Sequence, residues 1–140
     1  TPMQWDDSDN GGFTTGTPWM HSNPNYVDIN VVREEEREHS VLRFYRTLTS
    51  LRKEHPVMVY GDYHQMLEDD EDLIVYLRQY EKETWLVICN FYGNERSMPQ
   101  KVQEILDQEH GTLLLGNYDD VTNETAEQIR PYEARIYQLS

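Results

Sequence analysis

The chain has 140 residues and a net charge of −14, and an acidic surface disfavours nucleic acid and anionic membrane as partners, because both attract cations. No apolar run approaches the roughly 20 residues that span a bilayer, and the first residues do not resemble a signal peptide. The single cysteine, Cys89, excludes the disulfide framework of a small secreted protein, so a cytoplasmic location is expected.

The first 30 residues are rich in Gly, Pro, Asn, Asp and Thr and show no steady hydrophobic period. Large side chains are nevertheless scattered through them, and these need something to pack on. They are Trp5, Phe13, Trp19, Met20 and Tyr26. The segment is therefore predicted to be an ordered loop. The charged run at residues 31–39 suits a solvated helical turn or a connection.

Residues Ser40 to Glu54 predict one amphipathic helix, because their apolar side chains recur at helical spacing. The apolar stripe consists of Val41, Phe44, Tyr45, Leu48 and Leu51. Ser40 is the expected N-cap, and Pro56 prevents continuation of the helix. A single helix cannot bury its stripe alone. Its partner must be the strands downstream, the loop upstream or a body that is absent from this chain.

After Pro56 the pattern changes to short strands separated by turn signals. The predicted strands are Val57–Tyr60, Tyr63–Glu68, Leu73–Tyr80, Thr84–Phe91, Glu95–Met98, Thr112–Gly116 and Glu133–Leu139, with a helical turn at Gln100–Gln108. The fold class is mainly β, an antiparallel sandwich of the Greek-key type. Its centre is the hairpin of Leu73–Tyr80 with Thr84–Phe91, with Trp85, Val87, Cys89 and Phe91 pointing to one side.

No set of residues assembles into a catalytic, metal or cofactor site. The run from Asp6 to Gly11 resembles the start of a calcium loop, but Thr17 stands where the closing carboxylate should be, so a solvated turn is favoured. The acids from Glu68 to Asp72 are read as an exposed turn rather than a catalytic pair. The histidines lack zinc-ligand spacing, and Cys89 is read as a core residue. Asn123-Glu124-Thr125 matches a glycosylation sequon, which means little without a secretion signal.

Several motifs are specific enough to indicate a family. They are Thr1-Pro2-Met3-Gln4-Trp5-Asp6, Asn10-Gly11-Gly12-Phe13-Thr14, Pro18-Trp19, Asn23-Pro24-Asn25-Tyr26 and Arg130-Pro131-Tyr132-Glu133-Ala134-Arg135. Together they closely resemble the late barrel region and C-terminal domain of α-glucosidases in the α-amylase-type glycoside hydrolase family 13. Oligo-1,6-glucosidases and dextran glucosidases are the nearest members, and the resemblance covers essentially the whole chain.

The resemblance implies the C-terminal fragment of an α-glucosidase. Residues 1–56 would be the last loop and last helix of a (β/α)₈ barrel, and residues 57–140 the C-terminal β-sandwich. The catalytic nucleophile, the acid/base glutamate and the sugar-holding aspartate lie upstream in the family and have no counterpart here. The implied partners are the missing barrel of the same polypeptide and, through it, an α-linked oligosaccharide. Pairing of two copies through the barrel-facing surface is also expected if that surface is exposed.

The resemblance places Met3, Gln4 and Trp5 nearest the rim of the sugar pocket, with packing favoured over direct contact. The alternative function is a carbohydrate-binding module, in which tryptophans and tyrosines stack on sugar rings. A flat exposed row of two or more aromatic residues on one sheet face would support it. Within the family, Asn23 to Tyr26 favours enzymes acting on isomaltose-type oligosaccharides over trehalose-6-phosphate hydrolases or sucrose isomerases.

Overall fold

The computed structural model describes residues 1–122 and 126–140, so the sequon at Asn123-Glu124-Thr125 lies outside the described residues. The chain divides into two compact units, Thr1–Ser50 and Leu51–Ser140, and each is described by itself. The division falls inside the first predicted domain, residues 1–56. Among the described residues, no helix is long and apolar enough to cross a membrane.

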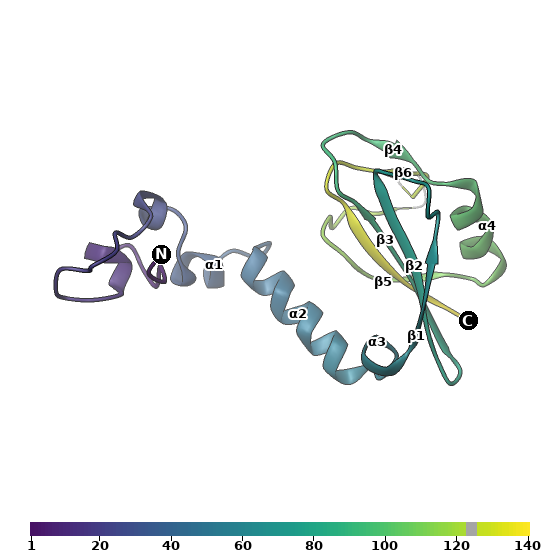
Figure 1. The fold of residues 1–140 in the computed structure, drawn as a ribbon, viewed down its shortest axis with the longest axis horizontal. Helices are drawn as coiled ribbons and strands as arrows, with labels where there is room; N and C mark the ends of the chain where they lie inside the picture. Colours follow the sequence, from purple (N-terminus) through teal and green to yellow (C-terminus); the bar gives the residue numbers. More distant parts are fainter. Residues whose placement is uncertain (123–125) are drawn as a thin grey trace. The chain divides into compact units, whose positions relative to one another are not determined.

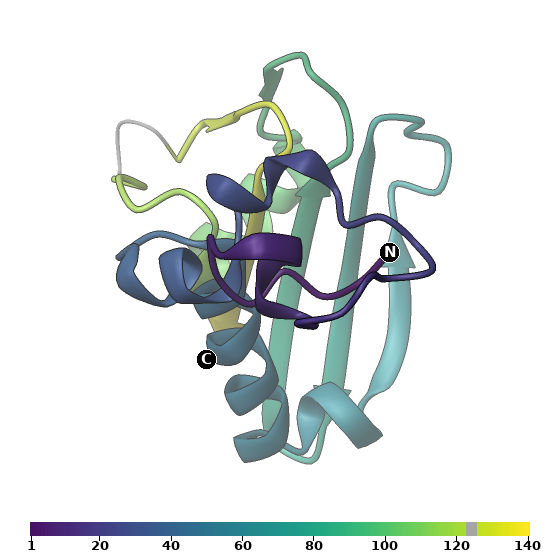
Figure 2. The same ribbon diagram turned by 90° about the vertical axis from the view of Figure 1, so that its left-hand side faces the viewer.

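The first unit contains short helical elements linked by irregular but hydrogen-bonded segments (Figure 2). They are the 3₁₀ helices η1 (Asp9–Gly12) and η2 (Pro24–Val27) and the helix α1 (Val31–Glu36), followed by α2 (Val41–Glu54), whose last turn belongs to the second unit. The first 30 residues, predicted to be an ordered loop, are hydrogen-bonded and include the two 3₁₀ helices, which were not predicted. The charged run at residues 31–39 begins as a helix.

Helix α2 begins and ends where the sequence predicted. The Ser40 hydroxyl accepts a hydrogen bond from the Arg43 backbone N–H at 3.2 Å, so Ser40 is the N-cap. None of the helix residues is buried, and Val41 and Tyr45 of the apolar stripe are 81% and 63% exposed. Val41 and Tyr45 are therefore largely uncovered in this chain, whereas Phe44, Leu48 and Leu51 are partly buried.

The second unit is built on a five-stranded antiparallel sheet of order β1-β2-β3-β7-β5 (Figure 1). Its strands are β1 (Asp62–Met66), β2 (Leu73–Tyr80), β3 (Glu83–Asn90), β5 (Thr112–Gly116) and β7 (Ala134–Leu139). The short strands β4 (Arg96–Ser97) and β6 (Gln128–Ile129) pair separately, and α4 spans Gln100–Gln108. The prediction of a mainly antiparallel β fold with few helices is confirmed.

The predicted central hairpin is present. Strands β2 and β3 pair along their whole length, from Leu73 opposite Asn90 to Tyr80 opposite Glu83. Trp85, Val87 and Cys89 share one face of β3, since side chains alternate along a strand. Phe91 lies one residue beyond the end of β3 and is exposed, so the prediction was wrong to place it in that strand.

One predicted strand is a helix. Val57–Tyr60 forms α3, because the carbonyl of Pro56 accepts the N–H groups of Val59 and Tyr60 at 2.9 and 2.8 Å. Proline fixes φ near the helical value and needs no partner for its missing N–H at a helix start. The valines favoured a strand by propensity, but this backbone bonding outweighed that preference. Strand β6 was not predicted, because a strand of two residues is too short to show an alternating hydrophobic pattern.

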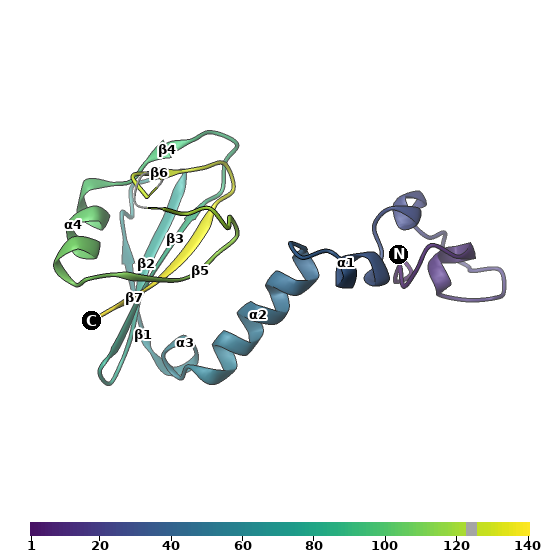
Figure 3. The ribbon, with the colours of Figure 1, turned by 180° about the vertical axis from the view of Figure 1, so that it is seen from behind.

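The main core lies on one face of the sheet. Val75, Leu86 and Ile88 pack there with Val102 of α4 and Ile129 of β6, all of them buried. Helix α4 and the pair β4–β6 thus cover this face, and α3 lies on the opposite side of the sheet (Figures 1 and 3). The opposite face keeps some of its side chains exposed.

Candidate functional site

The N-terminal segment is fastened to the start of α1. The backbone N–H groups of Val31 and Val32 donate to the carbonyls of Gln4 and Trp5 at 2.9 and 3.1 Å. The first N–H groups of a helix have no partner within it, so they are free to bind another segment. This pairing brings the Thr1–Asp6 motif against the start of α1, although Gln4 and Asn30 are 26 positions apart in the sequence.

Two side-chain amides hold this arrangement. The Gln4 amide nitrogen donates to Asn25 Oδ1 at 2.8 Å and to the Ile29 carbonyl at 2.9 Å. Asn30 is buried, and its amide nitrogen donates to the Tyr26 carbonyl at 2.8 Å. Both donors of the Gln4 amide are therefore hydrogen-bonded within the chain. The predicted packing role of Gln4 at the rim of the sugar pocket stays a prediction.

The turn after Trp5 depends on two glycines. The Trp5 N–H donates to the Gly11 carbonyl at 2.8 Å, and Gly12 has a φ of +66°. A Cβ at Gly12 would lie 2.6 Å from Asp6 Oδ2. Hydrogen bonds from the Ser8 hydroxyl and backbone N–H lower the pKa of Asp6. The Asp6 carboxylate therefore organises a local turn, and no metal-binding cluster of three or more His, Cys, Asp or Glu occurs within residues 1–122 and 126–140.

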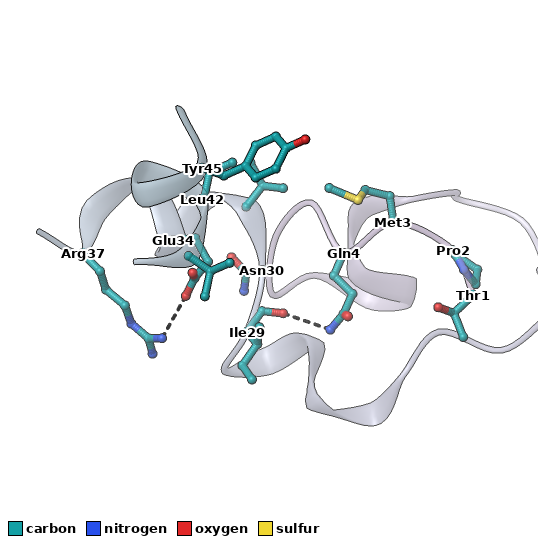
Figure 4. Close-up of a pocket in the computed structure, with 12 residues that line it drawn as sticks. Thr1, Pro2, Met3, Gln4, Ile29, Asn30, Glu34, Arg37, Leu42 and Tyr45 are labelled. Carbon is teal, nitrogen blue, oxygen red and sulfur yellow. Dashed lines mark hydrogen bonds and ion pairs between the residues drawn. The ribbon is translucent and has the colours of Figure 1, made fainter. Parts of the chain in front are cut away.

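A cavity of about 830 Å³ lies in the first unit (Figure 4). It is lined by Thr1, Pro2, Met3, Gln4, Ile29, Asn30, Val31, Glu34, Arg37, Val41, Leu42 and Tyr45. Of the three predicted rim residues, Met3 and Gln4 line this cavity, whereas Trp5 is half exposed outside its lining. Because the apolar stripe of α2 forms part of the wall, the sequence-predicted loop and helix meet at this cavity.

The charges of the cavity do not form a catalytic pair. Glu34 is the one carboxylate in the lining, and it pairs with Arg37 at 3.0 Å (Figure 4). Retaining glycoside hydrolysis needs two carboxyl groups about 5 Å apart. These lining residues can therefore pack against an apolar or mixed surface, but they do not supply the acid and nucleophile of that reaction.

A buried ionic cluster in the second unit was missed by sequence reasoning. Glu133 and Arg135 are completely buried and pair at 2.8 Å, and Arg130 pairs with Glu133 at 3.0 Å. Burial acts to raise the pKa of Glu133, but hydrogen bonds from the two arginines outweigh it and lower the pKa to about 2. Arg130 also lies 3.9 Å from the centre of the Tyr118 ring. The sequence pattern that could have indicated this cluster is the position of Glu133 between Arg130 and Arg135.

The other candidate acids and the cysteine have structural environments. Arg96 pairs with Asp70 at 3.0 Å and with Asp72, and Asp70 accepts the backbone N–H groups of Asp72 and Leu73. Although partial burial opposes it, this bonding lowers the pKa of Asp70. The acidic run is therefore a hydrogen-bonded turn. Burial raises the pKa of the Cys89 thiol, which disfavours a nucleophile. Cys89 is nevertheless only half-buried, on the face of β3 opposite the main core, so it is not the core residue that was predicted.

Comparison with known proteins extends the motif evidence. The family described as "Alpha amylase, catalytic domain" matches residues 1–61. The chain is 46% identical to oligo-1,6-glucosidase of Halalkalibacterium halodurans over 98% of its length, and 36% identical to trehalose-6-phosphate hydrolase of Bacillus subtilis over its whole length. The chain spans only about a quarter of these relatives, 24% and 25% of their lengths.

Solved structures of related enzymes also match this chain. Trehalose-6-phosphate hydrolase of Bacillus licheniformis matches with a TM-score of 0.86 and 35% identity, over 100% of this chain and 25% of that one. Isomaltulose synthase of Klebsiella sp. LX3 matches with a TM-score of 0.83 and 33% identity over the same shares. The chain belongs to the α-amylase-type glycoside hydrolases, family 13. Within that family its sequence is similar to oligo-1,6-glucosidases along nearly its whole length.

Proposed function

We propose that this chain is the C-terminal part of a retaining α-glucosidase that cleaves α-glucosidic bonds at the non-reducing end of short oligosaccharides. The observation that carries the proposal is the 46% identity to an oligo-1,6-glucosidase over 98% of this chain but only 24% of that enzyme. A match of this kind is expected when a sequence corresponds to one portion of a longer enzyme.

The chain itself has a structural role in this proposal, without catalytic carboxylates of its own. Helix α2 serves as the last helix of the (β/α)₈ barrel, and residues 57–140 form the C-terminal β-sandwich with Greek-key connections. The cavity lining supports this role, since its single carboxylate is already paired with Arg37. The nucleophile and the acid/base residue are supplied by the remainder of the polypeptide.

The proposed substrates are isomaltose-type α-1,6 oligosaccharides. The chain is 40–46% identical to five oligo-1,6-glucosidases over 98–99% of its length, and 33–36% identical to two trehalose-6-phosphate hydrolases. Solved structures of trehalulose synthase and isomaltulose synthase are 33–35% identical. A trehalose-6-phosphate hydrolase or sucrose isomerase is the second candidate within the family.

The proposed partner of the first unit is the upstream barrel of the same polypeptide. Val41 and Tyr45 of α2 expose apolar surface beside Met3, all three at the wall of the cavity. Exposed apolar surface of this kind marks an interaction site. A second copy of the chain is the competing occupant, and a cytoplasmic location remains part of the proposal.

A chimera tests the proposed function. The quarter of the H. halodurans oligo-1,6-glucosidase that matches this chain is replaced by this chain, and hydrolysis of isomaltose, maltose and trehalose 6-phosphate is measured. The expected result is hydrolysis of isomaltose, with no restored activity in the same enzyme truncated before the matched quarter. A folded but inactive chimera would contradict the proposal.

The isolated chain provides the complementary test. Purified chain is incubated at high loading with p-nitrophenyl α-glucoside and isomaltose beside a mock preparation, and no turnover above the mock is expected. Turnover that disappears on replacing one Asp or Glu of this chain would show a catalytic pair within it and overturn the assignment of a structural role.

The role of Gln4 is tested in the same chimera. Gln4→Ala removes the bonds to Asn25 and Ile29, so it should lower the melting temperature while leaving KM for isomaltose within about twofold. Thr1→Ala, at the same cavity wall, is the matched control and should change neither quantity. A large increase in KM at unchanged melting temperature would instead assign Gln4 to direct sugar contact.

A further inference from the structure

Residues 126–133, here called the strap, lead through β6 to the start of β7. Among the described residues, the strand pairing of the strap is limited to the two residues of β6, which lie beside β4 (Figure 3). Within residues 126–133, which the structure describes throughout, Ile129 and Glu133 are the buried ones, and Ile129 belongs to the main core. A segment with little apolar burial and little strand pairing belongs to the less stable parts of a fold.

The strap is fastened by side chains of the strands beside it. Arg135 of β7 is completely buried, and its guanidinium donates to the carbonyls of Ala126 and Gln128 at 3.1 and 2.6 Å. Asn90, at the end of β3, is 3% exposed, and its amide nitrogen donates to the Arg130 carbonyl at 2.9 Å. Both donors are buried by the chain's own residues, so the presence of further polypeptide does not expose these bonds.

The turn at the end of the strap contains a strained residue. The Glu133 N–H donates to the Arg130 carbonyl at 3.2 Å, which closes a four-residue turn with Tyr132 in third place. Tyr132 has a φ of +54°, whereas a type II turn normally has Gly or Asn at this position. The Tyr132 N–H donates to the Tyr92 carbonyl at 3.1 Å, and its carbonyl accepts from the Asn117 amide at 2.8 Å. A strained conformation of this kind persists only where the surrounding structure holds it.

The carboxylate of Glu133 connects the two ends of the strap. One of its oxygens accepts the Arg130 backbone N–H at 2.7 Å, at the turn. The carboxylate also pairs with the Arg135 guanidinium at 2.8 Å, and that guanidinium holds the carbonyls of Ala126 and Gln128 at the other end. Loss of the Glu133 charge therefore weakens both ends at once.

From this arrangement we infer that the strap opens as one unit while the sheet stays folded, and that Glu133 is the clamp that keeps it closed. Opening releases the strain at Tyr132, whereas it uncovers Ile129 and breaks the ion pairs of Glu133. The turn therefore favours opening and the buried cluster opposes it. The strap is expected to be the first part of the second unit to open on heating. This device does not depend on the proposed function.

Hydrogen–deuterium exchange of the whole chain, followed by mass spectrometry of peptic fragments, tests the inference. Under native conditions, fragments within residues 126–133 should exchange at least tenfold faster than fragments of β2 and β3, because local opening precedes global unfolding. The same difference is expected in the folded chimera with the H. halodurans enzyme, in which the upstream barrel is present. Equal exchange rates in the strap and in the hairpin, in either protein, overturn the separate opening.

Two variants should change the opening in opposite directions. Tyr132→Asn relieves the strain, since Asn tolerates a positive φ, and should slow exchange in the strap several-fold. Tyr92→Asn, at a neighbouring tyrosine without a positive φ, is the matched control and should not slow it. Glu133→Gln should accelerate exchange at least tenfold more in the strap than in the hairpin. Glu68→Gln, at an exposed position, should leave both rates unchanged.

The variants also separate the clamp from a general effect on stability. Equal acceleration of strap and hairpin in Glu133→Gln would show that the carboxylate stabilises the whole sheet, and the clamp would then be rejected. Unchanged or faster strap exchange in Tyr132→Asn would rule out the contribution of the strained turn. If Glu133→Gln does not fold, the wild type and Tyr132→Asn still decide, because neither removes a buried group.

Discussion

Gly12 illustrates how a single residue supports the N-terminal segment. Its φ of +66° is costly for residues with a Cβ, and that Cβ would meet the Asp6 carboxylate at 2.6 Å. Gly16 has no positive φ, and the nearest atom to its added Cβ lies 3.7 Å away. The two glycines therefore form a matched pair within the same loop.

Gly12→Ala should destabilise the first unit by about 1–2 kcal/mol, because the backbone is strained and Asp6 must move. The measurement is the rate of limited proteolysis within the first 30 residues under native conditions. Gly16→Ala should leave that rate unchanged. Equal protection of the two variants would show that the turn tolerates a side chain at Gly12.

Glu133 is the residue on which the buried ionic cluster depends. Glu133→Gln leaves Arg135 buried without its charge partner, so it should lower the free energy of unfolding by about 3–5 kcal/mol. Glu95→Gln, in an exposed turn, is the control and should change stability by less than about 0.5 kcal/mol. Urea denaturation at neutral pH measures both, and equal midpoints would contradict the importance of the cluster.

The same carboxylate predicts a pH dependence. Its pKa is about 2 in the fold against 4.5 ordinarily, so it contributes stability above pH 4.5 that is lost as the pH falls through about 2. The lost contribution is roughly 3 kcal/mol. The difference in unfolding free energy between wild type and Glu133→Gln should shrink over this range. A difference that stays constant from pH 7 to pH 2 would contradict the lowered pKa.

Among the elements, the β2–β3 hairpin was predicted most completely from the sequence. Its turn contains a residue with an unfavourable backbone conformation. Glu81 has a φ of +53°, a conformation that Asn tolerates better than Glu. Glu81→Asn should therefore raise the stability of the second unit by about 0.5–1 kcal/mol. Lys82→Asn, at the next residue, which lacks a positive φ, should give no gain. Thermal unfolding followed by circular dichroism compares the two, and an unchanged midpoint for Glu81→Asn would refute the expectation.

At the scale of the whole molecule, the exposed apolar residues of α2 have a consequence in solution. Val41 and Tyr45 expose most of their surface, and no residue of the helix is buried. The isolated chain should therefore associate with itself as its concentration rises, and Val41→Lys with Tyr45→Lys should reduce that association. Light scattering over a concentration series measures it. A monodisperse wild-type monomer with a protected N-terminal segment would contradict this prediction.

The sequence by itself determined the elements with a strong period. The helix from Ser40 to Glu54 and the hairpin centred on β2 and β3 follow from spacing, because side chains at those intervals must share a face. It also determined the family, since the Thr1–Asp6 and Arg130–Arg135 motifs are specific. The placement of Met3 and Gln4 at one cavity agrees with that reading, while their part in the sugar pocket stays a prediction.

Only the tertiary structure decided the features that depend on distant partners. Val57–Tyr60 carries the valines of a strand, yet Pro56 and the contacts of α3 with Arg78 make it a helix. The ion pairs of Glu133 and the pairing of Gln4 with Asn25 likewise join groups whose geometry no local pattern encodes. The arrangement of the tyrosines on β1 and β2 is a further example, because the register of the two strands sets which rings share a face, and a shift of one residue would turn Tyr63 to the other side.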